Sequence, residues 1–293
     1  MLIKEPGIMY KLLLLLLALV GLPTQAKLVV NFPQADPAPP HHHYYRQVLE
    51  LALEKSGEPF TLNPVPLNES QFRIAQMLFR GNPVNLAWMG TSSEYEQKLL
   101  PVRVPLMRGL SGFRVLIINR SRQPEFSQVQ SLADLAAFTG VQGIGWSDIE
   151  VLKGAGLNIS AARRTTILDM LNRDQHVDYY PRSPVEAFGE LAAQGQDYPQ
   201  LMVEPRLLLH YPFAVYFFVS PEAPRLAEAL TRGLERAYSD GSFMALFERH
   251  PLIRDSLRQL QAEQRLRLEL ANPDLTEATR RLPDHYWHPG ARP

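Results

Sequence analysis

The chain has 293 residues, 45% of them apolar, and its 30 lysines and arginines balance 30 aspartates and glutamates. A net charge of zero argues against a nucleic-acid-binding protein, which needs a basic face to pair with phosphates. The sequence has no cysteine, and this excludes disulfides, zinc–thiolate sites and thiol nucleophiles. The length allows one large domain or two of modest size.

The first 26 residues have the pattern of a secretory signal peptide. Lys4 and Lys11 precede an unbroken apolar run over residues 12–20, and small residues lead up to Ala26. The alternative is a membrane anchor, but the run is about half of the ~20 residues that a spanning helix requires. We therefore expect cleavage after Ala26 and a soluble, periplasmic protein.

Short apolar runs alternate with segments of helical spacing in the next part of the chain. Strands are expected at residues 27–32, 60–65 and 85–89. Helices are expected from Tyr45 to the stop at Gly57, at residues 71–79, and after a capping box at residues 91–94. This alternation predicts an α/β fold with a largely parallel sheet.

The alternation breaks at residues 102–112, where Pro105, Gly109 and Gly112 favour a connection between two bodies. Strands are expected beyond it at residues 113–119, 141–146, 176–180 and 212–220. Capping boxes are expected at residues 131–134, 147–150 and 183–186, and helices over residues 220–237, 242–247 and 259–270.

Ligands of open α/β sheets bind beyond the carboxyl ends of the strands, where helix N-termini gather. Arg182 stands at such a point, and its guanidinium could hold a ligand carboxylate through two parallel hydrogen bonds. The alternatives are a solvated arginine or a pair with Asp178 or Glu186. Glu186 itself is expected to close its capping box.

Aromatic and polar residues at the same strand ends complete the candidate site. Trp146 and Trp88 could form flat walls, although both could equally be core residues. Asp148 could accept a ligand ammonium or simply favour a helix start. The remaining candidates are Thr91 as a hydrogen-bonding group and Tyr45, Tyr180 and Tyr211 as further aromatic contacts.

No motif in the sequence marks a catalytic or metal site. The chain lacks a nucleophile elbow, a phosphate loop and a His-Glu-x-x-His helix. His41, His42 and His43 are adjacent and are expected on a loop, where they cannot easily all face one ion. We therefore expect no metal, no cofactor and no catalytic residue.

Several of these segments together resemble the solute-binding proteins of polar amino-acid transporters. The resemblance rests on residues 85–94 (NLAWMGTSSE), 131–135 (SLADL), 141–143 (VQG), 213–220 (FAVYFFVS) and 240–243 (DGSF). A closer resemblance, to an uncharacterised branch, rests on residues 145–148 (GWSD), 178–182 (DYYPR) and 210–213 (HYPF).

The resemblance implies a type II periplasmic binding protein fold, with two α/β lobes joined by a two-strand hinge. The first lobe would comprise residues 27–108 and 220–293, and the second residues 109–219. Transporter members of the group usually hold the ligand carboxylate with an arginine after the Thr-Ser turn. Tyr95 stands there in this chain, so either Arg182 replaces that arginine or the ligand is not a standard amino acid.

The function implied is binding of a small polar ligand, amino-acid-like or carboxylate-bearing, by closure of the lobes. The expected partners are that ligand and a membrane permease or receptor, and the protein is expected to be a monomer. Two alternatives remain open: an enzyme on the same fold, such as a dehydratase of a cyclic acid, or a sensor that feeds a membrane receptor.

Overall fold

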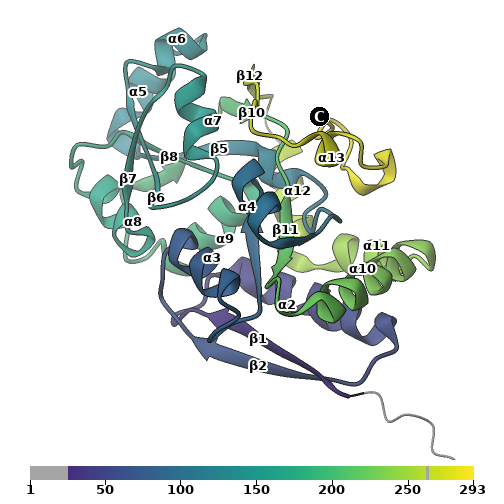
Figure 1. Cartoon of the computed structure of the whole chain (residues 1–293). Coiled ribbons are helices and arrows are strands. Elements are labelled where there is room, and N and C mark those ends of the chain that lie inside the picture. Colours follow the sequence, from purple (N-terminus) through teal and green to yellow (C-terminus); the bar gives the residue numbers. More distant parts are fainter. Residues whose placement is uncertain (1–25, 262–263) are drawn as a thin grey trace, which may run out of the picture.

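The computed structural model describes residues 26–261 and 264–293, which form two α/β lobes (Figure 1). The expected signal peptide, apart from Ala26, lies outside the described residues. Within the described ranges, no helix has both the length and the apolar character needed to cross a membrane.

Five strands form the centre of the first lobe. β1 (Leu28–Gln34) runs parallel to β2 (Phe60–Pro66). β11 (Val215–Val219) lies antiparallel between β3 (Leu86–Gly90) and β4 (Leu100–Val102). The helices of this lobe are α2 (Pro40–Ser56), α3 (Gln71–Phe79), α4 (Ser93–Lys98), α10 (Pro224–Ser239) and α11 (Ser242–Arg249).

Asn85 joins these two sets of strands. Its side chain accepts a hydrogen bond from the backbone amide of Asn31 at 2.9 Å and donates one to the carbonyl of Val29 at 2.8 Å. The start of β3 is thereby fixed beside β1, which positions Trp88 and Gly90 at the edge facing the second lobe.

The second lobe is built on a seven-stranded sheet with the order β12-β10-β5-β8-β6-β7, in which β9 also pairs with β5. The strands are β5 (Phe113–Asn119), β6 (Thr139–Gly143), β7 (Asn158–Ala162), β8 (Tyr179–Arg182), β9 (Leu201–Val203), β10 (Leu207–His210) and β12 (Leu266–Glu269). The helices are α5 (Gln123–Phe126), α6 (Leu132–Leu135), α7 (Ile149–Gly154), α8 (Arg164–Asn172), α9 (Pro184–Gln194) and α12 (Pro251–Gln261).

This sheet is mixed, whereas a largely parallel sheet was expected. β6 is parallel to β7 and β8, but β5 is antiparallel to β8, β9 and β10. The chain enters the second lobe through β5 and returns through β10, so these two neighbouring strands must run in opposite directions.

Two chain segments cross side by side between the lobes, residues 103–112 and 211–214. The amide of Leu106 donates to the carbonyl of Val215 at 2.9 Å, and the amide of Tyr211 donates to the carbonyl of Gly112 at 3.1 Å. A Cβ atom on Gly112 would lie 2.1 Å from the carbonyl oxygen of Tyr211, so only glycine allows this approach. The crossing is the two-strand hinge expected from the sequence.

The strand pairing differs at two points from the division into lobes expected above. β11 was expected to end the second lobe but pairs with β3 and β4 of the first. The C-terminal part was expected in the first lobe, yet β12 pairs in parallel with β10. Residues 259–270, expected to be one helix, contain the end of α12 and all of β12.

After β12 the chain packs over the hinge through the short helices α13 (Glu277–Arg280) and η3 (Asp284–Tyr286). Asn272 donates from its side chain to the carbonyl of Pro212 at 2.8 Å. Arg108 donates from its guanidinium to the carbonyl of Trp287 at 2.8 Å. Trp287 is buried, and its ring lies against Gly109. The C-terminal segment therefore braces both crossing segments.

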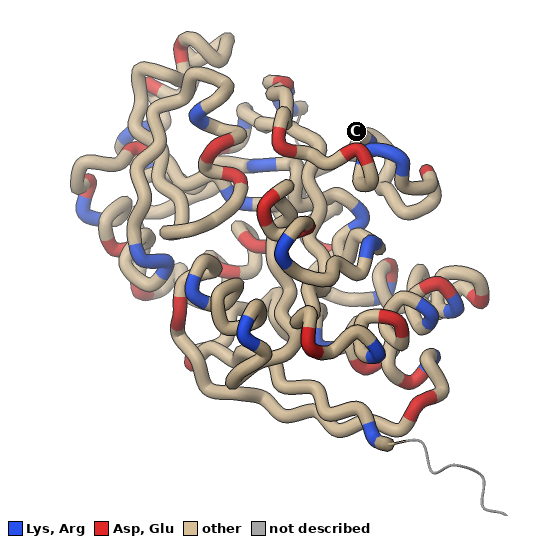
Figure 2. Tube along the Cα trace, viewed as in Figure 1, with Lys and Arg blue, Asp and Glu red and all other residues tan. Residues whose placement is uncertain are grey.

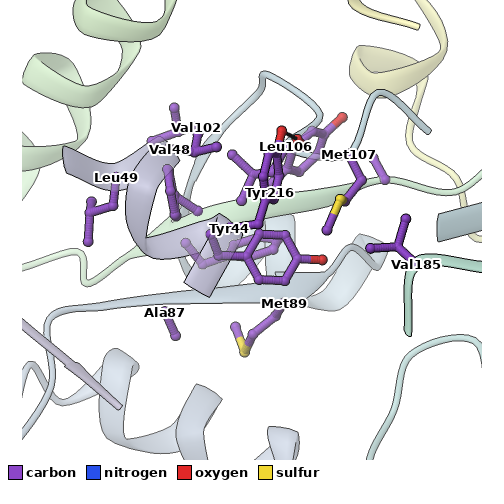
Figure 3. Packing of buried hydrophobic residues seen from close by; sticks show 14 of the residues in the cluster. Tyr44, Val48, Leu49, Ala87, Met89, Val102, Leu106, Met107, Val185 and Tyr216 are labelled. Carbon is purple, nitrogen blue, oxygen red and sulfur yellow. Dashed lines mark hydrogen bonds between the residues drawn. The ribbon is translucent and has the colours of Figure 1, made fainter. Parts of the chain in front are cut away.

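Two hydrophobic cores hold the lobes. One lies on a single face of the second sheet and contains Leu116, Ile118 and Leu152. The larger core continues from the first lobe through the hinge to the second, and Figure 3 shows part of it, with Tyr44 of α2 and Val185 of α9. The hydroxyl of Tyr44 donates to the carbonyl of Leu106 at 2.8 Å, which ties α2 to the hinge.

Candidate functional site

A cavity of about 470 Å³ lies between the lobes. Its walls come from α2, α3 and β3 of the first lobe, from the β6–α7 turn, the start of α8 and the β8–α9 junction of the second, and from the hinge. The candidate residues that line it are Tyr45, Trp88, Trp146, Asp148 and Arg182.

Arg182 ends β8 at the floor of this cavity and is 2% exposed. Its Nε and Nη2 both donate to the carboxylate of Glu190, and its Nη1 lies 3.1 Å from Glu186 Oε1. The guanidinium also lies 4.8 Å from the ring centroid of Trp146. A pair with Asp178 was the other alternative, but Asp178 pairs with Arg122 at 2.6 Å.

Arg114 is a second buried cation at the floor, and the sequence analysis missed it. Its Nε donates to the Tyr211 hydroxyl at 2.7 Å, and its Nη2 lies 2.8 Å from Asp148 Oδ2. Arg114 is only 4% exposed because β5 is buried along its whole length. An arginine within the apolar run of residues 113–119 was the available signal, since a buried charge needs partners.

The two carboxylates of the cavity floor are Asp148 and Glu186, and both accept hydrogen bonds from neighbouring groups. Asp148 Oδ2 accepts from Gln142 at 2.9 Å and from Tyr211 at 2.8 Å, in addition to its contact with Arg114. Asp148 is the N-cap residue of α7, but its side chain makes no capping hydrogen bond, because it turns inward to these partners. The capping box expected at residues 147–150 is therefore absent.

Glu186 closes the expected capping box with Ser183 and also faces the cavity. Its Oε2 accepts from the Ser183 amide at 3.1 Å and from the Ser183 hydroxyl at 2.8 Å, and lies 3.4 Å from Arg114. Burial alone would raise the pKa of Glu186, but Arg182 and Arg114 outweigh it and lower that pKa to about 2. Glu186 is therefore a carboxylate at neutral pH.

Aromatic side chains from both lobes also line the cavity. The Trp88 ring lies 5.7 Å from Tyr45 and 5.3 Å from His42, measured between centroids. In the second lobe Trp146 stacks on Tyr180 with a centroid distance of 6.1 Å. Trp88 and Trp146 each line the cavity and also pack against the core. Each is therefore both a cavity wall and a core residue, the two alternatives that the sequence left open.

Three candidate residues lie behind the cavity lining, where each supports a side chain or helix. Thr91 is buried and donates to Glu96 Oε1 at 2.6 Å. Tyr180 lies beneath Trp146, and Tyr211 holds Asp148 and Arg114. None of the three is among the residues that line the cavity within the described part of the chain.

The histidines are on a helix, whereas a loop was expected. α2 begins at Pro40, because proline is favoured at a first helical position, and so residues 41–43 form its first turn. His41 and His42 line the cavity, and burial lowers the pKa of each. No cluster of three or more potential metal-binding side chains occurs in residues 26–261 and 264–293.

Arg163 and Arg164 form the cavity's rim at the start of α8, together with Thr165. Their guanidinium groups have no ion-pair or hydrogen-bond partner among the described residues. Charges of both signs are spread over both lobes (Figure 2), and the net charge of the chain is zero. The two arginines without partners are therefore a local feature of the rim. The sequence analysis missed it because Arg163, the residue before α8, makes no side-chain capping hydrogen bond and so gives no capping signal.

The lobes touch each other beside the cavity. The Tyr95 hydroxyl donates to the carbonyl of Gly145 at 3.3 Å. Gly145 has φ +79°, and a Cβ atom there would lie 2.8 Å from the Cβ of Phe72 at the start of α3. A Cβ atom on Gly90 of β3 would likewise lie 2.9 Å from Ser147 Oγ. The structure is therefore a closed arrangement, in which glycines allow the close contact.

Comparison with protein-family models and with curated proteins found no match. Several solved structures share the architecture. An ancestral arginine-binding protein bound to arginine superposes with a TM-score of 0.58 at 13% identity, over 76% of this chain and 98% of that one. The substrate-binding protein AbpA of an amino-acid ABC transporter from Streptococcus pneumoniae, bound to L-arginine, has a TM-score of 0.56 at 17% identity, over 80% and 95%.

A histidine kinase sensor domain with similarity to periplasmic binding proteins has a TM-score of 0.54 at 14% identity, over 76% of this chain and 95% of that one. These superpositions establish the architecture, but at identities this low they do not identify the ligand. The chain has the two-lobed α/β fold of the type II periplasmic binding proteins, as its sequence motifs implied.

Proposed function

We propose that this protein binds a small polar solute between its lobes and closes on it, without chemical change of the solute. The observation that carries the proposal is the cavity, whose lining comes from both lobes and from the two crossing segments of the hinge. A ligand held by both lobes makes some of its contacts only in the closed state, and this difference allows binding to drive closure.

We assign direct ligand contacts to the side chains that line the cavity. Trp88, Trp146 and Tyr45 provide apolar walls, and Arg182 with Asp148 forms the charged floor. We assign a supporting role to the residues behind them, which are Thr91, Tyr180 and Tyr211.

The ionisation of the cavity favours binding over catalysis. A general acid or base works best when its pKa lies near the operating pH. Burial instead lowers the pKa of His41, and the arginines lower that of Glu186 to about 2. At neutral pH the first is neutral and the second fully ionised, which suits a fixed network of contacts.

We further propose a periplasmic, monomeric protein that is cut after Ala26 and presents its closed form to a membrane partner. The likeness both to substrate-binding proteins of importers and to a kinase sensor domain supports a permease or a receptor as that partner. Neighbouring genes for a permease or for a sensor kinase would discriminate between the two.

The experiment is a thermal-shift screen of the purified protein against amino acids, small organic acids and short peptides, followed by calorimetric titration of the compounds that raise the melting temperature. The proposal expects saturable binding, and recovery of the compound unchanged after long incubation. Conversion of a bound compound would instead favour the enzyme alternative, and the absence of any binding would contradict the proposal.

A further inference from the structure

After β12 the chain crosses from the second lobe to the first along the side of the hinge. The amide of Leu270 donates to the carbonyl of His210 at 2.8 Å, and the side chain of Asn272 donates to the carbonyl of Pro212 at 2.8 Å. Pro273 follows in this crossing, and a proline ring fixes φ at about −65°. The crossing therefore follows the hinge closely and has little freedom to bend at that residue.

The crossing ends in a buried network on the first lobe. Glu96 of α4 accepts hydrogen bonds from the hydroxyls of Thr276 and Thr279, each at 2.9 Å. The hydroxyl of Tyr216 in β11 donates to Thr279 Oγ1 at 3.0 Å. Glu96 and Thr279 are both buried, so breaking these bonds would leave buried polar groups without partners. This end of the crossing is therefore firmly attached to the first lobe.

The chain then returns and holds a bent part of the hinge. Arg108 and Gly109 have φ values of +51° and +79°, so the hinge turns sharply there. The guanidinium of Arg108 donates to the carbonyls of His285 and Trp287 at 3.1 and 2.8 Å, and the carbonyl of Arg108 accepts from the amide of His288 at 2.7 Å. Because the buried ring of Trp287 packs on Gly109, the hinge backbone cannot rotate at this turn without displacing that ring.

The last residues are attached to the second lobe again. The carbonyl of Gly290 accepts from Arg267 of β12 at 3.0 Å, and β12 itself pairs with β10. Residues 270–293 therefore contact both lobes and the hinge, and none of them lines the cavity. Hinge motion is absorbed by φ and ψ changes in a few residues. Rotation of the lobes must thus either bend this segment as well or break its contacts.

We propose that residues 270–293 form a strap that restrains the opening of the lobes and keeps the ligand-free protein near its closed arrangement. The apparent Kd of a ligand equals its intrinsic Kd divided by the fraction of protein in the binding-competent state. By raising the closed fraction, the strap tightens binding without touching the ligand. The inference rests on the proposed function, because it requires lobes that open and close.

The test measures the distance between the lobes without any ligand. Spin labels on Arg80→Cys and Arg173→Cys report this distance, since the chain has no other cysteine. Two separate variants loosen the strap. Arg108→Gln removes the guanidinium that holds two strap carbonyls, and Pro273→Gly frees the backbone at an exposed residue of the crossing.

The matched control is Arg292→Gln, because the partner of Arg292, Asp284, lies within the strap itself. We expect both loosened variants to shift the ligand-free distance distribution to longer distances and to broaden it, and the control to match the parent protein. If Arg108→Gln does not fold, Pro273→Gly decides the result, since Pro273 is exposed.

Two results would contradict the inference, and they differ in what else they contradict. A broad distribution in the parent protein that neither loosened variant changes would overturn the inference and leave the proposed function standing. A single short distance in the parent protein and in both loosened variants would overturn the inference together with the proposed function, because the lobes would then not open.

Discussion

Replacement of Gly145 by alanine should weaken ligand binding, because Gly145 is where the second lobe touches the first. The new Cβ would lie 2.8 Å from the Cβ of Phe72 and 3.0 Å from its backbone nitrogen. Carbon atoms normally approach no closer than about 3.5 Å. The overlap exists only when the lobes are closed, so it opposes closure and not the folding of either lobe.

The matched control is Gly156→Ala in the same lobe. Gly156 has φ +84° and Gly145 has φ +79°, so alanine at either position meets the same backbone strain, about 1–2 kcal/mol. A Cβ atom on Gly156 would have nothing within 4 Å. The two variants should therefore lose similar stability to urea, and only Gly145→Ala should bind ligand more weakly.

The expected difference follows from the clash. Forcing an extra methyl group into a packed contact costs about 1–3 kcal/mol, which corresponds to a Kd raised about 5- to 150-fold. Kd would be measured by calorimetric titration with the compound that the thermal-shift screen identifies. If both variants bind within a factor of two of each other, Gly145 does not meet Phe72 in the bound state and the closure argument is refuted.

Three further predictions concern stability. Arg182→Met should destabilise the fold by about 3–5 kcal/mol in urea unfolding, because it leaves the carboxylate of Glu190 buried without its cation. Addition of Glu190→Met should restore much of the loss, whereas a loss below 1 kcal/mol for the single variant would speak against a buried pair. Burial lowers the pKa of His41 below its usual 6.5, so below pH 6.5 the unfolded chain binds a proton that the folded chain does not. The free energy of unfolding should therefore fall as the pH drops below 6.5, by up to about 1.4 kcal/mol per pH unit. His41→Gln should flatten this dependence of stability on pH, and an unchanged dependence would contradict the prediction. Trp287→Ala should lower the free energy of unfolding by about 3–5 kcal/mol, since Trp287 is 3% exposed and its ring packs on Gly109. A stability within 1 kcal/mol of the parent protein would show that the C-terminal segment does not stabilise the hinge.

Local sequence signals predicted the elements whose boundaries depend on local chemistry. The helix at residues 71–79, the strand at residues 113–119 and the capping box of Ser183 with Glu186 all occur as expected. Each depends on periodicity, an apolar run or a side chain that bonds to a neighbouring amide. The same rule misplaced the start of α2, because Pro40 allows a helix to begin earlier than the apolar spacing suggests.

Long-range pairing was not accessible from the same signals. Nothing in residues 215–219 or 266–269 shows which lobe's sheet each strand joins, since that depends on partners distant in sequence. The floor of the cavity shows the same limit. Arg182 could be recognised as a candidate from its position, but the two glutamates that occupy it, and Arg114 from another strand, are brought there only by the tertiary fold.

The central claim, closure of two lobes around a ligand, is tested most directly by a distance between the lobes. The chain has no cysteine, so Arg80→Cys at the end of α3 and Arg173→Cys at the end of α8 would give a specifically labelled pair for a spin-label distance measurement. We predict a longer and broader distance distribution without ligand and a single shorter distance when ligand is saturating. Identical distributions in the two conditions would contradict the account.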